Sequence, residues 1–229
     1  NDEVKNDAIR INTLKSNYDE VIEVLNKEKI EYQISDLVND GLIINKSMVN
    51  HPLFKEGKIT VQDIASQMVT EITAPEENSI VIDLCSAPGG KTAHLSAWMN
   101  NTGTIYACDI HPHKIKLMEK NFKRLGVENV KTQLIDAREV NKVVKEESFD
   151  YVVCDMPCSG LGVMSHKCDL KYNITYQAIE EIIKLQREIL VASYPLIKKG
   201  GYLTVSTCTI NKSENEEQID FLLKQFPDL

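Results

Sequence analysis

The chain has 229 residues, of which 42% are hydrophobic and 26% charged, and its formal net charge is −8. This composition is typical of a soluble globular protein, and the negative charge argues against a protein that binds nucleic acid nonspecifically through a positive overall charge. The polar start excludes a signal peptide, and the longest clear apolar run, 189–197, is far shorter than the ~20 residues of a membrane helix. The start also lacks Met, which indicates a fragment or a processed chain. Six cysteines without a secretion signal favour a reducing cytoplasm and reduced thiols.

The first 56 residues predict a small α+β (RRM-like) subdomain. Residues 8–12 are typical of a short strand, and the apolar positions in 18–28 have helical spacing. Residues 30–50 are mixed and contain an NDG turn signal. Residues 57–72 predict a strand that continues into a helix, and we assign 57–229 to a second domain.

From residue 79 onward, strand and helix patterns alternate. Apolar, β-branched runs predict strands at 79–84, 104–108, 130–135, 150–154 and 202–206. Helical patterns fall at 91–99, 112–125, 175–194 and 213–225, and a Ser213-x-x-Glu216 capping box opens the last of them. This alternation of apolar strands with helices predicts an α/β fold with a parallel, doubly wound sheet.

Acidic residues, glycines and cysteines follow the predicted strands. In a doubly wound sheet, ligands bind at the carboxyl ends of the strands, near the point where the strand order reverses. The sequence therefore predicts a ligand site built from the segments that end these strands: 83–90, Asp109, Asp136, 155–160 and 206–209.

The turn "DLCSAPGGKTAHL" (83–95) joins a strand to a helix. A phosphate-binding P-loop would need Gly where Cys85 stands, and the GxGxxG spacing of a dinucleotide site is absent. An adenosyl cofactor without phosphates, such as S-adenosylmethionine, fits better, with Asp109 accepting hydrogen bonds from the ribose. An NAD oxidoreductase is less favoured, and a purely structural glycine turn is the alternative without a ligand.

Two segments, "VVCDMPCSG" (152–160) and "STCT" (206–209), carry cysteines at the ends of strands. The CxxxC spacing of Cys154 and Cys158 has no matching second pair, so a metal site is not expected. Cys85, Cys108 and Cys154 lie in or at the ends of apolar strands, which favours packing. Spacing alone allows either Cys158 or Cys208 to act as a nucleophile.

Together, "DLCSAPGGKT" (83–92), "DMPCSGLGV" (155–163) and "STCT" (206–209) resemble the RNA cytosine-5 methyltransferases, most closely the bacterial small-subunit ribosomal RNA methyltransferase B type. The resemblance covers about 8–225 and implies a Rossmann-like, S-adenosylmethionine-dependent methyltransferase sheet. It implies that Cys208 is the nucleophile, that Cys158 assists product release and that Asp155 lies between cofactor and base. It also implies that Asp109 holds the ribose, that Asp136 lies near the adenine, and that the cofactor is wrapped by Cys85, Ser86, Ala87, Pro88, Gly89, Gly90 and Lys91.

The sequence departs from the family pattern in a few places. Ser86 replaces a usual Ala, Thr209 a usual Ser, and the run 165–168 lacks the family's arginines, which leaves RNA contact through that loop open. The resemblance also implies that a preceding helical RNA-binding domain and a terminal antiparallel strand pair are missing. We therefore expect the strand that ends at Ser206 to lie at a sheet edge.

The glycine turn, the acidic strand ends and the two cysteine motifs, together with the resemblance, predict an enzyme that methylates C5 of a cytosine in RNA. The resemblance implies 16S ribosomal RNA as substrate and a covalent Cys–C6 adduct. We expect a cytoplasmic monomer that binds RNA but no membrane or metal. Two alternatives remain: a DNA cytosine-5 methyltransferase with Cys158 as the attacking thiol, and a non-catalytic RNA-binding or ribosome-assembly module on the same fold.

Overall fold

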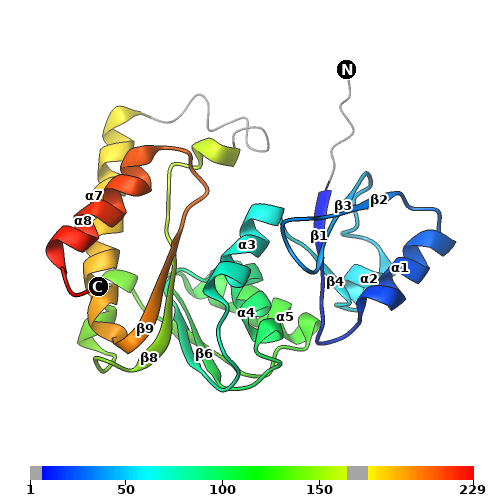
Figure 1. Cartoon of the computed structure of the whole chain (residues 1–229), viewed down its shortest axis with the longest axis horizontal. Helices are drawn as coiled ribbons and strands as arrows, with labels where there is room; N and C mark the ends of the chain where they lie inside the picture. Colours follow the sequence, from blue (N-terminus) through cyan, green and yellow to red (C-terminus); the bar gives the residue numbers. More distant parts are fainter. Residues whose placement is uncertain (1–6, 164–174) are drawn as a thin grey trace.

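A computed structural model describes residues 7–163 and 175–229, which are organised around two sheets (Figure 1). Within these residues no helix is both long enough and apolar enough to span a membrane. The altered loop 165–168, with Cys168, lies outside the described residues.

The small sheet has the strand order β2-β3-β1-β4, with antiparallel pairing throughout the part described. Its elements are β1 (Asp7–Ile11), α1 (Tyr18–Lys27), β2 (Tyr32–Ile34), β3 (Gly41–Ile44), α2 (Pro52–Lys55) and β4 (Ile59–Val61). This is the β-α-β-β-α-β order of ferredoxin-like units. The boundary predicted after residue 56 falls before β4, whose pairing with β1 extends the small sheet to Val61.

Local sequence explains how α1 closes this small unit. The Asn17 side chain accepts the Glu20 N–H at 2.9 Å and so caps the first turn. Val21 and Leu25, four residues apart, lie on one face of the helix and are fully buried with Ile9 of β1. The unit therefore has a hydrophobic core of its own.

The larger sheet is parallel, with the order β7-β6-β5-β8-β9 in the described residues, as the alternating pattern predicts. Its strands are β5 (Ile80–Asp83), β6 (Thr104–Asp109), β7 (Val130–Leu134), β8 (Phe149–Asp155) and β9 (Ile197–Ser206). The chain winds outward from β5 to β7 and then returns to β8 on the other side of β5. This reversal places a ligand crevice at the carboxyl ends of β5 and β8.

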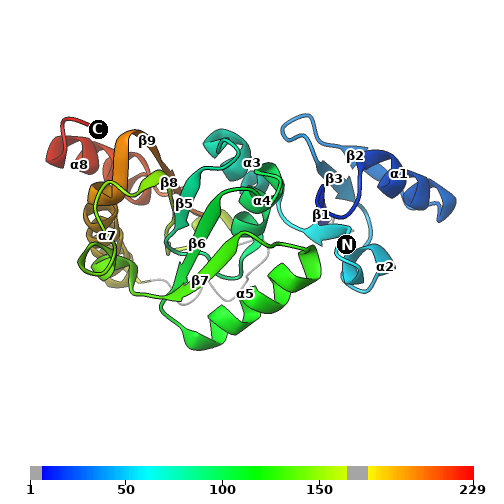
Figure 2. The same cartoon turned by 90° about the horizontal axis from the view of Figure 1, so that it is seen from below.

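Helices cover both faces of this sheet (Figures 1 and 2). The helices α3 (Ile64–Thr73), α4 (Gly90–Trp98) and α5 (Pro112–Leu125) lie on one side, and α7 (Tyr176–Ser193) and α8 (Glu216–Gln225) on the other. Alternation along β8 explains both contacts, because successive side chains point to opposite faces. Val153 packs with α3 and α4, whereas Val152 and Cys154 pack with α7.

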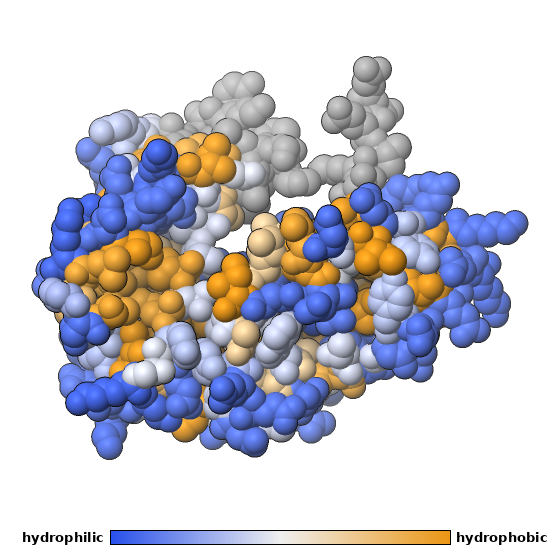
Figure 3. Space-filling view, viewed as in Figure 1, coloured by the Kyte–Doolittle hydropathy of each residue, from blue (hydrophilic) through white to orange (hydrophobic). Residues whose placement is uncertain are grey.

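Strand β9 forms one edge of the described sheet, as expected, and β7 forms the other. Apolar side chains gather over β9 and α8 on the face shown in Figure 3. Among the residues of these two elements, Tyr202 of β9 is 63% exposed and Leu223 of α8 is 47% exposed.

The last helix begins later than its sequence pattern predicts. Ser213 lies in a 3₁₀ turn, η4 (Lys212–Glu214), which Asn211 caps by accepting the Ser213 N–H at 3.2 Å. Helix α8 then begins at Glu216 without a side-chain cap from Asn215. The capping-box prediction was therefore wrong, and the short turn lets the chain reverse direction before the helix starts.

Candidate active site

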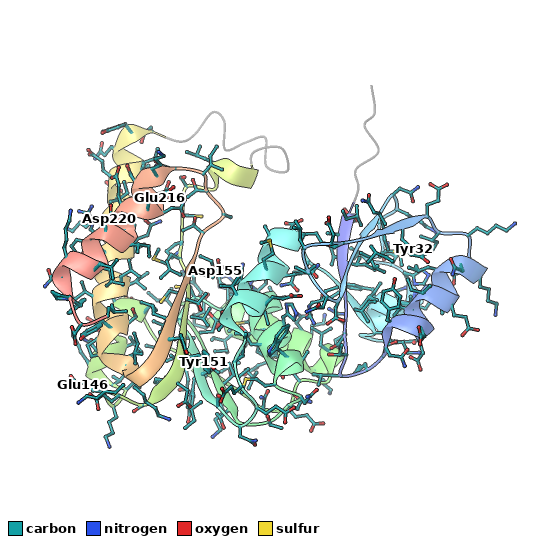
Figure 4. All side chains as sticks on the ribbon, viewed as in Figure 1. Tyr32, Glu146, Tyr151, Asp155, Glu216 and Asp220 are labelled. Atoms are coloured by element: carbon teal, nitrogen blue, oxygen red, sulfur yellow. The ribbon has the colours of Figure 1, made fainter. Side chains whose placement is uncertain are left out.

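The predicted strand ends meet at one edge of the large sheet. Strand register places Asp83 of β5 opposite Val153 of β8, and Asp155 opposite Ser206 of β9. Figure 4 shows Asp155 at the end of β8 that approaches α3, with Tyr151 farther back along the same strand. The segments that follow these strands are therefore neighbours in space.

The glycine turn after β5 leads directly into α4. Gly89 has φ +93° and caps the helix, and a Cβ there would lie 2.9 Å from the Phe122 ring. A Cβ on Gly90 would meet nothing within 4 Å. Ser86, which replaces the family's usual Ala, is buried and donates its hydroxyl to the Asp83 carbonyl at 2.7 Å. The turn is thus fixed from inside and leaves open space beside Gly90.

Other predicted cofactor residues flank this turn. Ala87 and Cys85 are half-buried, burial raises the pKa of the Cys85 thiol, and Pro88 is exposed after a cis Ala87–Pro88 bond. Asp109 ends β6 and is only 7% exposed. Its carboxylate accepts the His111 N–H at 2.9 Å.

Asp136 follows β7, and its carboxylate already has partners. It lies 2.6 Å from Arg138 and accepts the Arg138 N–H, which caps the short helix η1 (Ala137–Lys142). The hydrogen bond from the Arg138 side chain lowers the pKa of Asp136. The carboxylate therefore has a local capping role, and contact with an adenine stays a prediction.

Asp83 ends β5 below the turn and is 1% exposed. The Thr92 hydroxyl donates to its Oδ2 at 2.7 Å. Burial is the main cause that raises its pKa to about 6. This carboxyl group therefore ties the end of β5 to the first turn of α4.

Asp155 is held by two side chains from different elements. Lys91 of α4 lies 2.6 Å from Asp155 Oδ2, and the Ser206 hydroxyl of β9 donates to Oδ1 at 2.7 Å. Both partners of the ion pair are partly buried, which reduces screening by water. Lys91 therefore belongs to the site and is not merely a solvated helix residue.

The two cysteines of the paired motifs are in contact. Cys158 Sγ and Cys208 Sγ lie 3.0 Å apart, and the Cys208 N–H donates to Cys158 Sγ at 3.2 Å. Cys158 is half-buried and Cys208 is exposed. The hydrogen bond to Cys208, together with burial, raises the pKa of Cys158.

A cavity of about 410 Å³ opens in front of Cys208. Asp155 lines it from the end of β8, Lys91 from the first turn of α4, and Ser66 from the first turn of α3. The cavity brings together a thiol, a carboxylate and an ammonium group. Such a set can add a nucleophile to a polar planar ring and stabilise the charge that develops on it.

The remaining described cysteines are separate from this cavity. Cys108 and Cys154 are fully buried, and burial raises the pKa of each thiol to about 12. They pack as small apolar residues, as the sequence indicates. In the described part of the chain, no cluster of three or more His, Cys, Asp or Glu side chains is arranged to hold a metal ion.

One polar residue near the cysteines, Glu214, was not predicted as part of the site. It accepts the Ser159 N–H at 2.7 Å. Ser206, which contacts Asp155, lies in the predicted segment 206–209. Glu214 lies in the acidic run "SENEEQ", in which nothing marks it as the buried member.

Sequence comparison relates this chain to bacterial ribosomal RNA methyltransferases. A family model described as 16S rRNA methyltransferase RsmB/F matches residues 70–229. The probable ribosomal RNA small subunit methyltransferase B of Bacillus subtilis (strain 168) is 34% identical over 222 residues, which are 96% of this chain and 50% of the relative. The chain thus spans about half the length of the curated relatives that it matches.

Solved structures agree over nearly the whole chain. The crystal structure of a protein described as PH0851 has a TM-score of 0.95 and 37% identity, covering 100% of this chain and 52% of its own. A methyltransferase homolog protein from Pyrococcus horikoshii has a TM-score of 0.86 and 29% identity, covering 96% of this chain and 70% of its own. Together with the family match, these likenesses confirm the methyltransferase fold, and the chain belongs to the RsmB/F family of 16S rRNA methyltransferases.

Proposed function

We propose that this chain methylates C5 of a cytosine in RNA, with 16S ribosomal RNA as substrate and S-adenosylmethionine as methyl donor. Its family and the name of the Bacillus subtilis relative support this substrate class. The observation that carries the proposal is the cavity in which Cys208 meets Asp155 and Lys91.

The described residues fit the methyl donor. The open space beside Gly90 lets a ligand approach the backbone at the start of α4, and Asp109 offers a nearly buried carboxylate at the next strand end. The turn from Cys85 to Lys91, with Asp109 and Asp136, would hold the cofactor. When bound, S-adenosylmethionine supplies an electrophilic methyl group on a sulfonium.

Cys208 acts as the nucleophile. Its thiolate forms a bond to C6 of the cytosine, and the electrons of the C5–C6 double bond move onto C5, which can then take the methyl group. Asp155, held by Lys91 and Ser206, lies in the same cavity and stabilises the ring where charge develops at N3. The target base must leave any stack to enter the cavity.

Cys158 acts in the release of the product. After methyl transfer a base accepts the proton from C5, the electron pair of that C–H bond forms the C5–C6 double bond again, and the S–C6 bond breaks to release Cys208 as a thiolate. Cys158, 3.0 Å from Cys208 Sγ, is placed to assist this elimination. Cys208 is exposed and lines the cavity, whereas Cys158 is half-buried, which supports Cys208 as the attacking thiol.

Trapping with RNA that contains 5-fluorocytosine tests these roles. Fluorine cannot leave C5 as a proton does, so the adduct accumulates on the attacking thiol. We expect peptide mass spectrometry to find the adduct on Cys208, and Cys208→Ser to abolish it, whereas Cys154→Ser, a change in the core, keeps it. An adduct on Cys158 instead would support the DNA-type mechanism. Absence of both adduct and calorimetric S-adenosylmethionine binding would support a non-catalytic module.

A further inference from the structure

Glu214 is a buried carboxylate beside the cysteine turns, and the mechanism above gives it no part. It ends the 3₁₀ turn η4, which follows β9, and is 0% exposed. None of the ion pairs found among residues 7–163 and 175–229 includes it. A buried acid in such a place is costly unless hydrogen-bond donors surround it.

Donors from three elements reach this carboxylate. Oε2 accepts the Ser159 N–H at 2.7 Å and Gln186 Nε2 at 3.3 Å. Oε1 accepts the Ser159 hydroxyl at 2.5 Å, Asn211 Nδ2 at 3.1 Å and the Thr209 hydroxyl at 3.5 Å. Because every partner can donate and both oxygens accept, the arrangement matches a carboxylate and not an amide.

The partners of Glu214 are the immediate neighbours of the two thiols. Ser159 follows Cys158 in the chain, and Thr209 follows Cys208. The Ser159 and Thr209 hydroxyls also contact each other at 3.0 Å. Gln186 of α7 donates in addition to the carbonyl of Pro157, the residue before Cys158, at 2.9 Å. One carboxylate thus connects the turn after β8, the turn after β9 and α7.

We propose that Glu214 is a positioning residue that sets the spacing of the Cys158 and Cys208 thiols. It acts through Ser159 and Thr209, the residues that follow the two cysteines in the chain. This inference rests on the proposed function, since the spacing matters for methyl transfer only if both thiols take part in it.

The test compares Glu214→Gln with Glu216→Gln, a matched change at an exposed position on α8. Glutamine keeps the size but turns an NH₂ group toward donors. We expect Glu214→Gln to lower kcat for RNA methylation roughly 100-fold, as a misplaced reacting group does, with the KM for S-adenosylmethionine unchanged. Glu216→Gln should match the wild type in both.

A second readout needs neither RNA nor cofactor. Phenylarsine oxide forms two As–S bonds with two adjacent thiols and releases water, so bridging of Cys158 to Cys208 reports their spacing directly. We expect bridging in the wild type and in Glu216→Gln, and roughly tenfold weaker bridging in Glu214→Gln, because the second bond depends on the geometry of the pair. If the wild type methylates no RNA, this readout still decides the role of Glu214.

Bridging and kcat equal to those of Glu216→Gln in a folded Glu214→Gln protein would overturn the inference. If Glu214→Gln does not fold, Thr209→Val decides, since it removes one hydroxyl of the network and keeps the side-chain shape. Weaker bridging in Thr209→Val supports the inference, and wild-type bridging overturns it.

Discussion

Asp83 joins β5 of the large sheet to the glycine turn. Its carboxyl group is buried, and burial disfavours its charged form. Its pKa in the folded protein is about 6, against an ordinary value of 3.8. The stability that its protonated form contributes is present below about pH 4 and is lost as the pH rises to about 6. A difference of about two pKa units corresponds to roughly 3 kcal/mol.

Asp83→Asn should remove this dependence on pH. We expect the free energy of unfolding of the variant, relative to wild type, to rise by about 3 kcal/mol between pH 4 and pH 7. Urea denaturation at a series of pH values measures the difference. Parallel stability profiles for the two proteins would contradict a raised pKa at Asp83.

A substitution at Gly90 distinguishes an effect on cofactor binding from an effect on the stability of the fold. Its added Cβ would contact no protein atom within 4 Å, so Gly90→Ala should change the thermal midpoint little. The same methyl group points into the space assigned to the methyl donor. We expect calorimetry to show S-adenosylmethionine binding weakened by roughly tenfold or more. Unchanged affinity would place the cofactor elsewhere.

Sequence motifs predicted the cysteines and the carboxylate of the candidate site but not Glu214, which contacts the turns that carry the cysteines. Cys158, Cys208 and Asp155 are of unusual type at unusual positions, so a motif reveals them. Glu214 looks like any other acid in "SENEEQ", because only the packing of three distant segments makes it buried. Its partners Ser159 and Gln186 are ordinary polar residues for the same reason.

At the scale of elements, the turns after β8 and β9 carry the Cys158 and Cys208 thiols, so the packing of these turns sets where the thiols lie. The Gly162 N–H donates to the Cys208 carbonyl at 3.1 Å, and a Cβ on Gly162 would lie 2.8 Å from the same oxygen. Gly162→Ala should therefore push the Cys208 turn away by several tenths of an ångström.

We expect Gly162→Ala to lower the single-turnover rate of methyl transfer roughly tenfold, while the unfolding midpoint stays close to that of wild type. Rapid-quench kinetics with labelled cofactor provides the rate. A rate equal to that of wild type would show that the turn accommodates the methyl group without moving Cys208.

The sequence predicted long elements better than short ones. The apolar runs of the large sheet and the helices between them match the structure, because burial on both faces leaves a clear pattern. The exceptions are β9, which begins at Ile197 and not at residue 202, and α8, which begins at Glu216 and not at residue 213. Strands β2 and β3 were not predicted, since they have only 3 and 4 residues and contain turn-forming or polar side chains. Their pairing depends on β1, which local sequence cannot show.

At the scale of the molecule, the small sheet is fastened to the end of α5. The buried Asn12 side chain donates to the carbonyls of Gly57 at 2.7 Å and Leu125 at 2.8 Å. Arg124 donates to the Phe54 carbonyl at 2.7 Å and lies 4.1 Å above the Phe54 ring. The Asn12–Leu125 and Arg124–Phe54 hydrogen bonds connect residues that are 113 and 70 positions apart.

Asn12→Ala would leave both carbonyls without this donor. We expect a loss of about 1–3 kcal/mol in the free energy of unfolding, the usual cost of buried groups that lose their partner. Urea denaturation measures it, with Asn26→Ala, at an exposed position on α1, as the control. Equal stability of the two variants would show that Asn12 does not join the two sheets.

The position of Glu214 in the chain has a consequence for synthesis on the ribosome. Domains tend to fold from the N-terminal side as the chain grows. The small sheet and the glycine turn are complete before Cys208 has been translated, whereas the thiol pair needs β9 and then Glu214. On the growing chain the two thiols can therefore align only after β8, β9 and Glu214 have all left the ribosome, although the small sheet can pair much earlier.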